Sequence, residues 1–238
     1  MLPFIFQEDT VASGACATGP RRAQPGNVKS APLGVALVRS GELYGPPGRT
    51  EDPMTIEPTD LRTERLLLRP FRLDDVNDVV AYANDQQWSR YLVRIPYPYS
   101  RRDGEQFVAQ TLLSSWEEHP QWAIVLDESV VGGINLDIVT RDRRANVGYA
   151  MARAEWGKGL TTEVARAVVD HGFERLGLET ITARADARNT ASRRLMEKLG
   201  MTREGVLRSR FVERGEGGER VDQVCYSLLR EEWERRAG

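Results

Sequence analysis

YAMARAEWGKGLTTE, residues 149–163, is the most informative segment of the chain. An apolar run that predicts a β-strand ends at Met151, and apolar residues recur at helical spacing from Leu160 onward. Gly157 and Gly159 lie between them, and glycine permits backbone conformations and a close approach that a Cβ would block. Because the first turn of a helix presents unpaired N–H groups and the positive end of its dipole, the segment predicts an anion site suited to a pyrophosphate.

Other interpretations apply to the same glycine pair. A P-loop requires a further glycine ahead of its Gly-Lys pair, and the segment before Gly157, RAEW, contains none. The dinucleotide-binding fingerprint requires a third glycine three residues after Gly159, where Thr162 stands. Both nucleotide-binding folds are therefore excluded, and a plain turn remains the alternative to an anion site.

The composition excludes several classes of protein. The 238 residues contain 33 Lys and Arg against 35 Asp and Glu, and a pI near 5.9 gives no electrostatic footprint for a polyanionic partner. No apolar run approaches the roughly 20 residues of a membrane helix, and the start of the chain lacks the features of an export signal. Cys16 and Cys225 are too few for a disulfide framework or a metal cluster. We therefore expect a cytoplasmic protein with no metal, no nucleic-acid partner and no membrane partner.

The chain divides near Met54. Residues 7–53 are rich in Gly, Pro, Ala and Ser and show no sustained periodicity, so they cannot repay the entropy of ordering. Periodic sequence begins just after Met54. The sequence therefore predicts that residues 1–53 are a disordered leader or precede a mis-annotated start, with Met54 as the hypothetical translation start, and that residues 54–238 form one domain.

The remaining elements are predicted from apolar periodicity, caps and glycine or proline stops. Strands are expected at 63–68, 122–126, 130–139, 146–151 and 180–185, and a hairpin at 206–214 and 220–228. Helices are expected at 74–84, from about 103 to just before 119, at 160–176 and at 189–199. His119 and His171 have no partner at metal-ligand spacing and are expected to be structural. The basic turn at 141–144 is expected to be solvated.

The order strand, two helices, strand meander, glycine turn, helix, strand, helix and hairpin resembles the GNAT acetyltransferase superfamily. Four segments resemble in particular its branch of ribosomal-protein N-terminal acetyltransferases, the RimJ/RimL type: TERLLLRPF (63–71), VGYAMARAEWGKGLTTEV (147–164), ARNTASRRLMEKLGMTREG (187–205) and CYSLLREEW (225–233). The resemblance covers residues 59–233. It implies an α/β (α+β) fold with a mixed, mostly antiparallel twisted sheet flanked by helices, and acetyl-CoA bound between the fourth and fifth strands.

The resemblance also implies which residues hold acetyl-CoA, with no metal. Main-chain N–H groups of the glycine turn would cradle the pyrophosphate, namely those of Gly157, Lys158, Gly159, Leu160, Thr161 and Thr162. The strand end at Tyr149 and Met151 would hydrogen-bond the pantetheine arm in the manner of an added strand. Asn189 and Ser192 would contact the coenzyme arm, and both also suit the start of a helix, as an N-cap and a first-turn hydroxyl.

Acetyl transfer to an amine needs a base for the ammonium, a donor for the tetrahedral oxyanion and an acid for the departing thiolate. The main-chain N–H near Met151 is the candidate oxyanion donor, and Ser192 is the candidate acid. Many members of the family carry a Tyr acid where this chain has Met196, and a Glu before the Ile-Gly-Tyr of the fourth strand where it has Asn146. The base is therefore unassigned, and the candidates are Asn146, ordering a water, and Asp137.

The acceptor implied by the resemblance is the α-amine of a protein or peptide N-terminus. A small amine such as a polyamine, an amino acid or an aminoglycoside is the alternative, and a strongly acidic acceptor groove would favour the polycation. The absence of the usual Tyr and Glu leaves open a non-catalytic coenzyme A binder used for sensing or scaffolding. Homodimers are common among members of the family, so a homodimer is one expected assembly.

Overall fold

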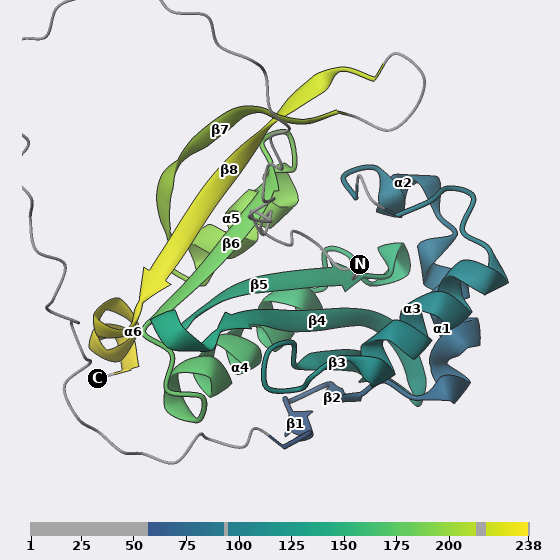
Figure 1. The fold of residues 1–238 in the computed structure, drawn as a ribbon, viewed down its shortest axis with the longest axis horizontal. Coiled ribbons are helices and arrows are strands. Elements are labelled where there is room, and N and C mark those ends of the chain that lie inside the picture. Colours follow the sequence, from purple (N-terminus) through teal and green to yellow (C-terminus); the bar gives the residue numbers. More distant parts are fainter. Residues whose placement is uncertain (1–56, 93–94, 213–217, 238) are drawn as a thin grey trace, which may run out of the picture. The chain divides into compact units, whose positions relative to one another are not determined.

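An eight-stranded sheet organises the part of the chain that the computed structural model describes, residues 57–92, 95–212 and 218–237 (Figure 1). The strand order is β1-β2-β3-β4-β5-β6-β8-β7. The strands are β1 (Leu61–Arg62), β2 (Leu67–Pro70), β3 (Gln121–Leu126), β4 (Ser129–Val139), β5 (Arg144–Met151), β6 (Thr180–Asp186), β7 (Thr202–Val212) and β8 (Arg220–Leu229). All neighbouring strands are antiparallel except β5 and β6, so the sheet is mixed and mostly antiparallel, which confirms the predicted fold class.

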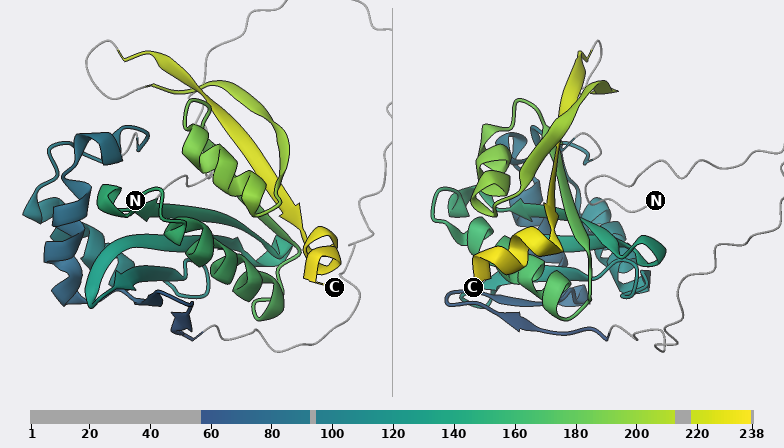
Figure 2. Two further views of the ribbon diagram at one scale, coloured as in Figure 1. Left: turned by 180° about the vertical axis from the view of Figure 1, so that it is seen from behind. Right: turned by 90° about the vertical axis from the view of Figure 1, so that its left-hand side faces the viewer.

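Helices pack on both faces of this sheet. They are α1 (Val76–Ala83), α2 (Gln86–Ser89), α3 (Arg101–Leu113), α4 (Leu160–Glu174), α5 (Thr190–Lys198) and α6 (Arg230–Ala237). Seen from behind, α4 and α5 lie in front of the strands (Figure 2). Ile134 and Leu136 of β4 are fully buried in one apolar cluster with Val164 of α4. Ala123 of β3 belongs to the other cluster, with Phe107 of α3, because successive residues of a strand point to opposite faces.

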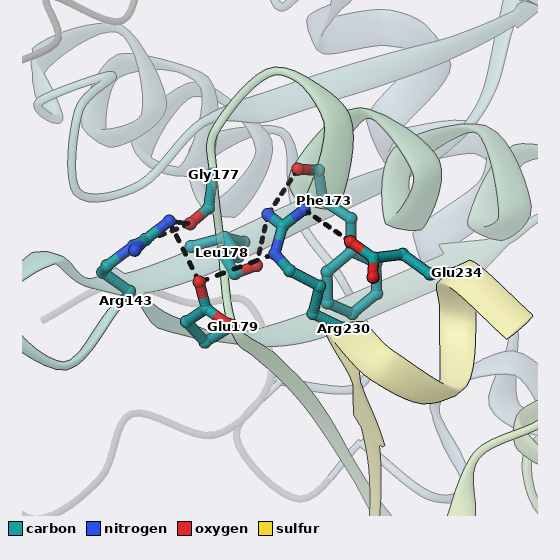
Figure 3. A network of polar contacts seen from close by, with 7 residues as sticks. All are labelled: Arg143, Phe173, Gly177, Leu178, Glu179, Arg230 and Glu234. Atoms are coloured by element: carbon teal, nitrogen blue, oxygen red, sulfur yellow. Dashed lines mark hydrogen bonds and ion pairs between the residues drawn. The ribbon is translucent and has the colours of Figure 1, made fainter.

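Two arginines cover the C-terminal end of α4 (Figure 3). Arg230 donates to the carbonyl oxygens of Phe173 and Leu178 at 2.6 and 2.7 Å. Arg143 donates from Nε and Nη2 to the Gly177 oxygen at 2.9 and 2.6 Å. Positive charge is favourable at this end of a helix, where carbonyl oxygens lack helical partners. The basic turn is expected to be solvated, and the Arg143 side chain is indeed 59% exposed. It also donates to a carbonyl, because the chain reverses at Gly177 and brings that oxygen to the guanidinium.

Three elements differ from the sequence-based expectations: the segment 63–68, the short helix α2 and helix α6. The segment 63–68 is not one strand, because a turn joins β1 to β2. In this turn Thr63 donates its N–H to the Leu66 oxygen at 3.0 Å, and the Thr63 hydroxyl accepts the Leu66 N–H at 3.1 Å, so the hydroxyl takes an amide that strand pairing would use. Helix α6 is short, strongly polar and absent from the predicted elements. It docks on α4 through Trp233, whose indole N–H donates to Asp170 Oδ1 at 2.7 Å.

The other strands and helices lie at or close to their expected positions, except that α3 ends at Leu113 instead of just before residue 119. The predicted leader, residues 1–53, lies outside the described residues, as do residues 213–217 in the loop of the hairpin. Among the described helices, none is both long enough and apolar enough to cross a membrane.

Candidate active site

The parallel strands β5 and β6 separate along their length. They pair only at Arg144 with Thr180, Ala145 with Ile181 and Asn146 with Thr182. Beyond this point β5 continues to Met151 against β4, and β6 continues to Asp186 against β8. The two strands therefore diverge from an apex at Asn146 and Thr182 (Figure 1). Within the described sheet, the edge of β5 that faces β6 has no strand partner over residues 147–151.

The register of β4 and β5 decides where the main-chain groups on this edge point. Ala152 donates its N–H to the Val131 oxygen at 2.7 Å, so Ala152 faces β4. Because antiparallel residues alternate, the N–H groups of Tyr149 and Met151 point to the side from which β6 has departed. The Met151 carbonyl oxygen accepts the indole N–H of Trp156 at 2.7 Å. The structure thus brings two main-chain N–H groups to the open edge of β5.

The turn between β5 and α4 presents a run of main-chain N–H groups. Gly157 and Gly159 have φ of +77° and +81°, a conformation that residues with a Cβ rarely adopt. The first helical hydrogen bonds run from Thr162 and Glu163 to the Gly159 oxygen, both at 3.1 Å. Within the described residues, the N–H groups at 157–161 have no hydrogen-bond acceptor. These N–H groups lie at the positive end of α4 and can hold an anion, whereas the N–H of Thr162 is already engaged.

Arg65, in the turn between β1 and β2, binds both the glycine turn at 157–159 and the first turn of α4. Its main-chain N–H and Nε donate to the Glu163 carboxylate at 3.0 and 2.7 Å, and its Nη1 donates to the Lys158 oxygen at 3.1 Å. Burial raises the pKa of Glu163, but hydrogen bonds from Thr63 and Arg65 outweigh it and lower that pKa. The Lys158 ammonium is paired with Glu155 at 2.9 Å. Sequence reasoning missed Arg65 because 98 residues separate it from Glu163, and its place in TERLLLRPF was the available signal.

Tyr149, Asn189 and Ser192 meet at the start of α5. The Asn189 Oδ1 accepts the Ser192 main-chain N–H at 3.1 Å, so Asn189 is the N-cap of this helix. The Tyr149 hydroxyl is buried beside Ser192 and has no well-formed hydrogen bond within the described part of the chain. Burial raises the pKa of Tyr149 to about 12, and the nearby Ser192 hydroxyl opposes this rise. Met196, which stands at the position expected for a Tyr acid, is only 1% exposed and belongs to the core. The phenol beside Ser192 is instead that of Tyr149, on β5.

A second polar group, which we call the Asp137 cluster, lies on the opposite face of the sheet beside the apex. It consists of His119, Asn135, Asp137 and Asn146. Asp137 of β4 is directly opposite Asn146 of β5. Asp137 Oδ1 accepts from Asn135 Nδ2 at 2.9 Å and lies 3.3 Å from His119 Nδ1. Within the described residues, Asp137 Oδ2 and both polar side-chain atoms of Asn146 are buried with no hydrogen-bond partner.

The two titratable groups of this cluster shift each other. Burial raises the pKa of Asp137, although contacts with His119, Asn135 and Asn146 oppose the rise. The hydrogen bond to Asp137 raises the pKa of His119 against the effect of burial. His119 has no partner nearby in the sequence and gains one because β3 pairs with β4, whereas His171 packs edge-on against Trp122. No three His, Cys, Asp or Glu side chains are grouped to hold a metal ion anywhere in the described ranges.

Comparison with known proteins identifies the family. Residues 65–202 match the model of the acetyltransferase (GNAT) domain. The N-acetyltransferase p20 of Bacillus licheniformis, itself described as uncharacterised, is 30% identical over 176 residues, which cover 73% of this chain and 97% of that protein. The chain therefore belongs to the GNAT family of acetyltransferases. It is an acyltransferase enzyme, an N-acetyltransferase, and enzymes of this family use acetyl-CoA.

Solved structures share the fold. The microcin C7 self-immunity acetyltransferase MccE, in complex with acetyl-CoA and AMP, is 18% identical with a TM-score of 0.63, over 70% of this chain and 93% of that chain. The ribosomal-protein-S5-alanine acetyltransferase of Vibrio fischeri is 18% identical with a TM-score of 0.64, over 74% of this chain and 98% of that chain. At this level of identity the likeness concerns the fold alone.

Proposed function

We propose that this N-acetyltransferase acetylates the α-amine at the N-terminus of a protein or peptide. The observation that carries the proposal is the chemistry of the Asp137 cluster, which offers one carboxylate among amide and imidazole groups. One carboxylate matches a single ammonium. A polyamine or an aminoglycoside carries several ammonium groups, and a complementary site would need several carboxylates.

Two further observations support this acceptor. The segments 63–71 and 187–205 resemble the RimJ/RimL type of N-terminal acetyltransferase. The Vibrio fischeri enzyme of the same fold is named for an alanine of a ribosomal protein. Both favour a polypeptide acceptor over a free amino acid.

The proposed coenzyme site uses main-chain groups at both of its ends. The pyrophosphate accepts hydrogen bonds from the N–H groups at 157–161, at the positive end of α4. The pantetheine arm pairs with the open edge of β5 through Tyr149 and Met151, as an added strand would. Asn189 and Ser192 approach the arm from the start of α5. Lys158 contributes little net charge, because Glu155 neutralises it.

The chemistry follows from these positions. The amine nitrogen attacks the thioester carbon, and the N–H of Met151 stabilises the tetrahedral oxyanion. The C–S bond then breaks, and the thiolate takes a proton from the Ser192 hydroxyl. The acetylated nitrogen gives up its extra proton to solvent, and Ser192 regains its own proton from solvent. The Tyr149 phenol lies beside the Ser192 hydroxyl and stays protonated at neutral pH, because burial raises its pKa to about 12. Asn146 lies at the apex, where its amide can orient the incoming amine.

A thiol-release assay tests the acceptor. The panel holds a lysine-free peptide with a free N-terminus, the same peptide with its N-terminus blocked, spermidine, glycine and an aminoglycoside. We expect release only with the free peptide. Faster release with one of the small amines would replace the proposed acceptor by that amine, and binding of acetyl-CoA without release for any acceptor would indicate a non-catalytic binder.

A further inference from the structure

We propose that Asp137, paired with His119, is the base that takes the proton from the acceptor ammonium. The inference rests on the proposed function, since it needs an amine that arrives protonated. It also fills the role left empty by Asn146, which stands where many family members have Glu and whose amide cannot accept a proton at neutral pH.

Asp137 lies where the amine must approach. Asn146, directly opposite, forms the apex from which β5 and β6 diverge. The proposed place of the thioester is the edge of β5 just beyond this apex, at Tyr149 and Met151. Gly148 follows Asn146 on the face of the Asp137 cluster and puts no side chain between that cluster and the open edge. Along β5, Tyr149 lies three residues, or roughly 10 Å, beyond Asn146, so the carboxylate lies on one face of the sheet near the proposed place of the thioester at the open edge.

The two oxygens of the Asp137 carboxylate differ in their hydrogen bonding. Oδ1 receives Asn135 Nδ2 at 2.9 Å and faces His119 Nδ1 at 3.3 Å. Oδ2 is buried and has no hydrogen-bond partner among the described residues. A buried acceptor without a donor is unfavourable, and an incoming ammonium would supply the donor. Burial also raises the pKa of Asp137, which brings its affinity for protons closer to that of an amine.

His119 gives the proton a route to water. The side chains of His119 and Asp137 are 24% and 21% exposed, so the pair is partly open to solvent. Asp137 Oδ2 takes a proton from the ammonium, which leaves a neutral amine with its lone pair ready for attack. The carboxyl proton then passes to Nδ1 of the neutral His119 ring, and the ring releases its Nε2 proton to water, which restores the carboxylate. Glu118, the other charged group acting on the ring, also raises the pKa of His119 and keeps it able to carry a proton.

Apart from Glu118, which is exposed, the polar groups around the pair do not offer a second base. The amides of Gln121, Asn135 and Asn146 lack a basic atom. Glu204 lies on β7, which β6 and β8 separate from β5, and it accepts a hydrogen bond from the Ser227 hydroxyl. The Asp137–His119 pair is therefore the basic group beside the apex within the described sheet.

The test compares two acceptors that differ in their need for a base. One is a peptide with an ordinary α-amine. The other carries an aminooxy group in place of that amine, which is neutral at pH 7 and attacks without prior deprotonation. Asp137→Asn keeps the shape of the side chain and removes the base. We expect turnover of the α-amine peptide to fall roughly 10²-fold or more, turnover of the aminooxy peptide to change less than about threefold, and acetyl-CoA affinity to stay constant.

Two variants complete the design. Asp142→Asn changes an exposed carboxylate in the turn after β4 and should leave both turnovers unchanged. His119→Gln should show a smaller loss with the same dependence on the acceptor, and it carries the test if Asp137→Asn does not fold. Equal losses with both acceptors, or no loss with either, would overturn the proposal. If the wild-type enzyme uses a small amine instead of a peptide, the proposed acceptor fails, and the same comparison is made with that amine and its aminooxy counterpart.

Discussion

Replacement of Gly159 tests the anion site with little disturbance elsewhere. Gly159 has φ of +81°, and an added Cβ would meet only Arg65 Nη2, at 3.7 Å. The cost of a side chain therefore comes from backbone conformation, about 1–2 kcal/mol for an L-residue in the left-handed region. Because domains typically have a free energy of unfolding of about 5–15 kcal/mol, Gly159→Ala should fold, and so should the more strained Gly159→Val.

Acetyl-CoA binding should suffer more than stability. If the strained residue turns the loop, the N–H groups of Lys158, Gly159 and Leu160 no longer converge on one phosphate. A hydrogen bond to a charged group contributes roughly 1.5–3 kcal/mol. The loss of one such bond corresponds to a Kd about 10- to 150-fold higher.

Calorimetric titration with acetyl-CoA measures this Kd, and thermal unfolding monitors the fold. Gly159→Asn should keep more affinity than Gly159→Ala, because Asn tolerates the left-handed conformation. Gly205→Val is the matched control, since a Cβ there meets nothing within 4 Å and the backbone is not left-handed. Unchanged affinity in Gly159→Val, or an equal loss in Gly205→Val, would refute the assignment of the anion site.

Three other perturbations have defined outcomes. Tyr149→Phe and Ser192→Ala should each lower kcat more than they raise the Kd of acetyl-CoA. Because both substitutions change one hydroxyl pair, the double variant should lose less kcat than the product of the two single losses. Steady-state kinetics measures these losses, and losses that multiply would show independent roles. The kcat/KM for an α-amine peptide should fall as pH drops through the raised pKa values of Asp137 and His119, since a protonated Asp137 accepts no proton; a pH profile that is the same in Asp137→Asn would contradict this. Arg230→Met should lower the Tm by several degrees in scanning calorimetry, because the Phe173 and Leu178 oxygens lose their hydrogen-bond donor. Each unsatisfied buried group lowers the free energy of unfolding by roughly 1–3 kcal/mol, and each kcal/mol lowers the Tm by about 2–4 °C. An unchanged Tm would show that water replaces the guanidinium.

The proposed anion site can be predicted from the sequence because its parts are contiguous. Gly157, Gly159 and the first turn of α4 lie within one short segment, and glycine at these positions indicates a local conformation without reference to the rest of the fold. Asn189 as a helix cap is readable for the same reason, since its partner Ser192 is three residues away. Local patterns of this kind need no knowledge of strand register.

The missed features depend on contacts between distant segments. His119 and Asp137 are 18 residues apart and meet only because β3 pairs with β4. Arg65 and Glu163 are 98 residues apart and meet only where the β1–β2 turn passes the start of α4. Hydrophobic periodicity predicts the strands and the helix, but it does not fix which residues face each other across them. The turn at Thr63 was misread because one hydroxyl hydrogen bond interrupts a run of residues that otherwise favours a strand.

Helix α4 is held at both ends, by Arg143 and Arg230 at its C-terminal end and by the Arg65–Glu163 ion pair at its start, while the main-chain N–H groups at 157–161 have no acceptor among the described residues. Its 15 residues span roughly 22 Å, with Arg143 and Arg230 at the carbonyl end and the glycine turn at the amide end. Because Arg230 begins α6, a truncation or bulky fusion that displaces α6 removes the hydrogen bonds of Arg230 to the Phe173 and Leu178 oxygens and the Trp233–Asp170 contact with α4. Labels and surface linkers for a biosensor built on this enzyme therefore belong away from residues 230–237, even though that segment lies a helix length from where the coenzyme would dock.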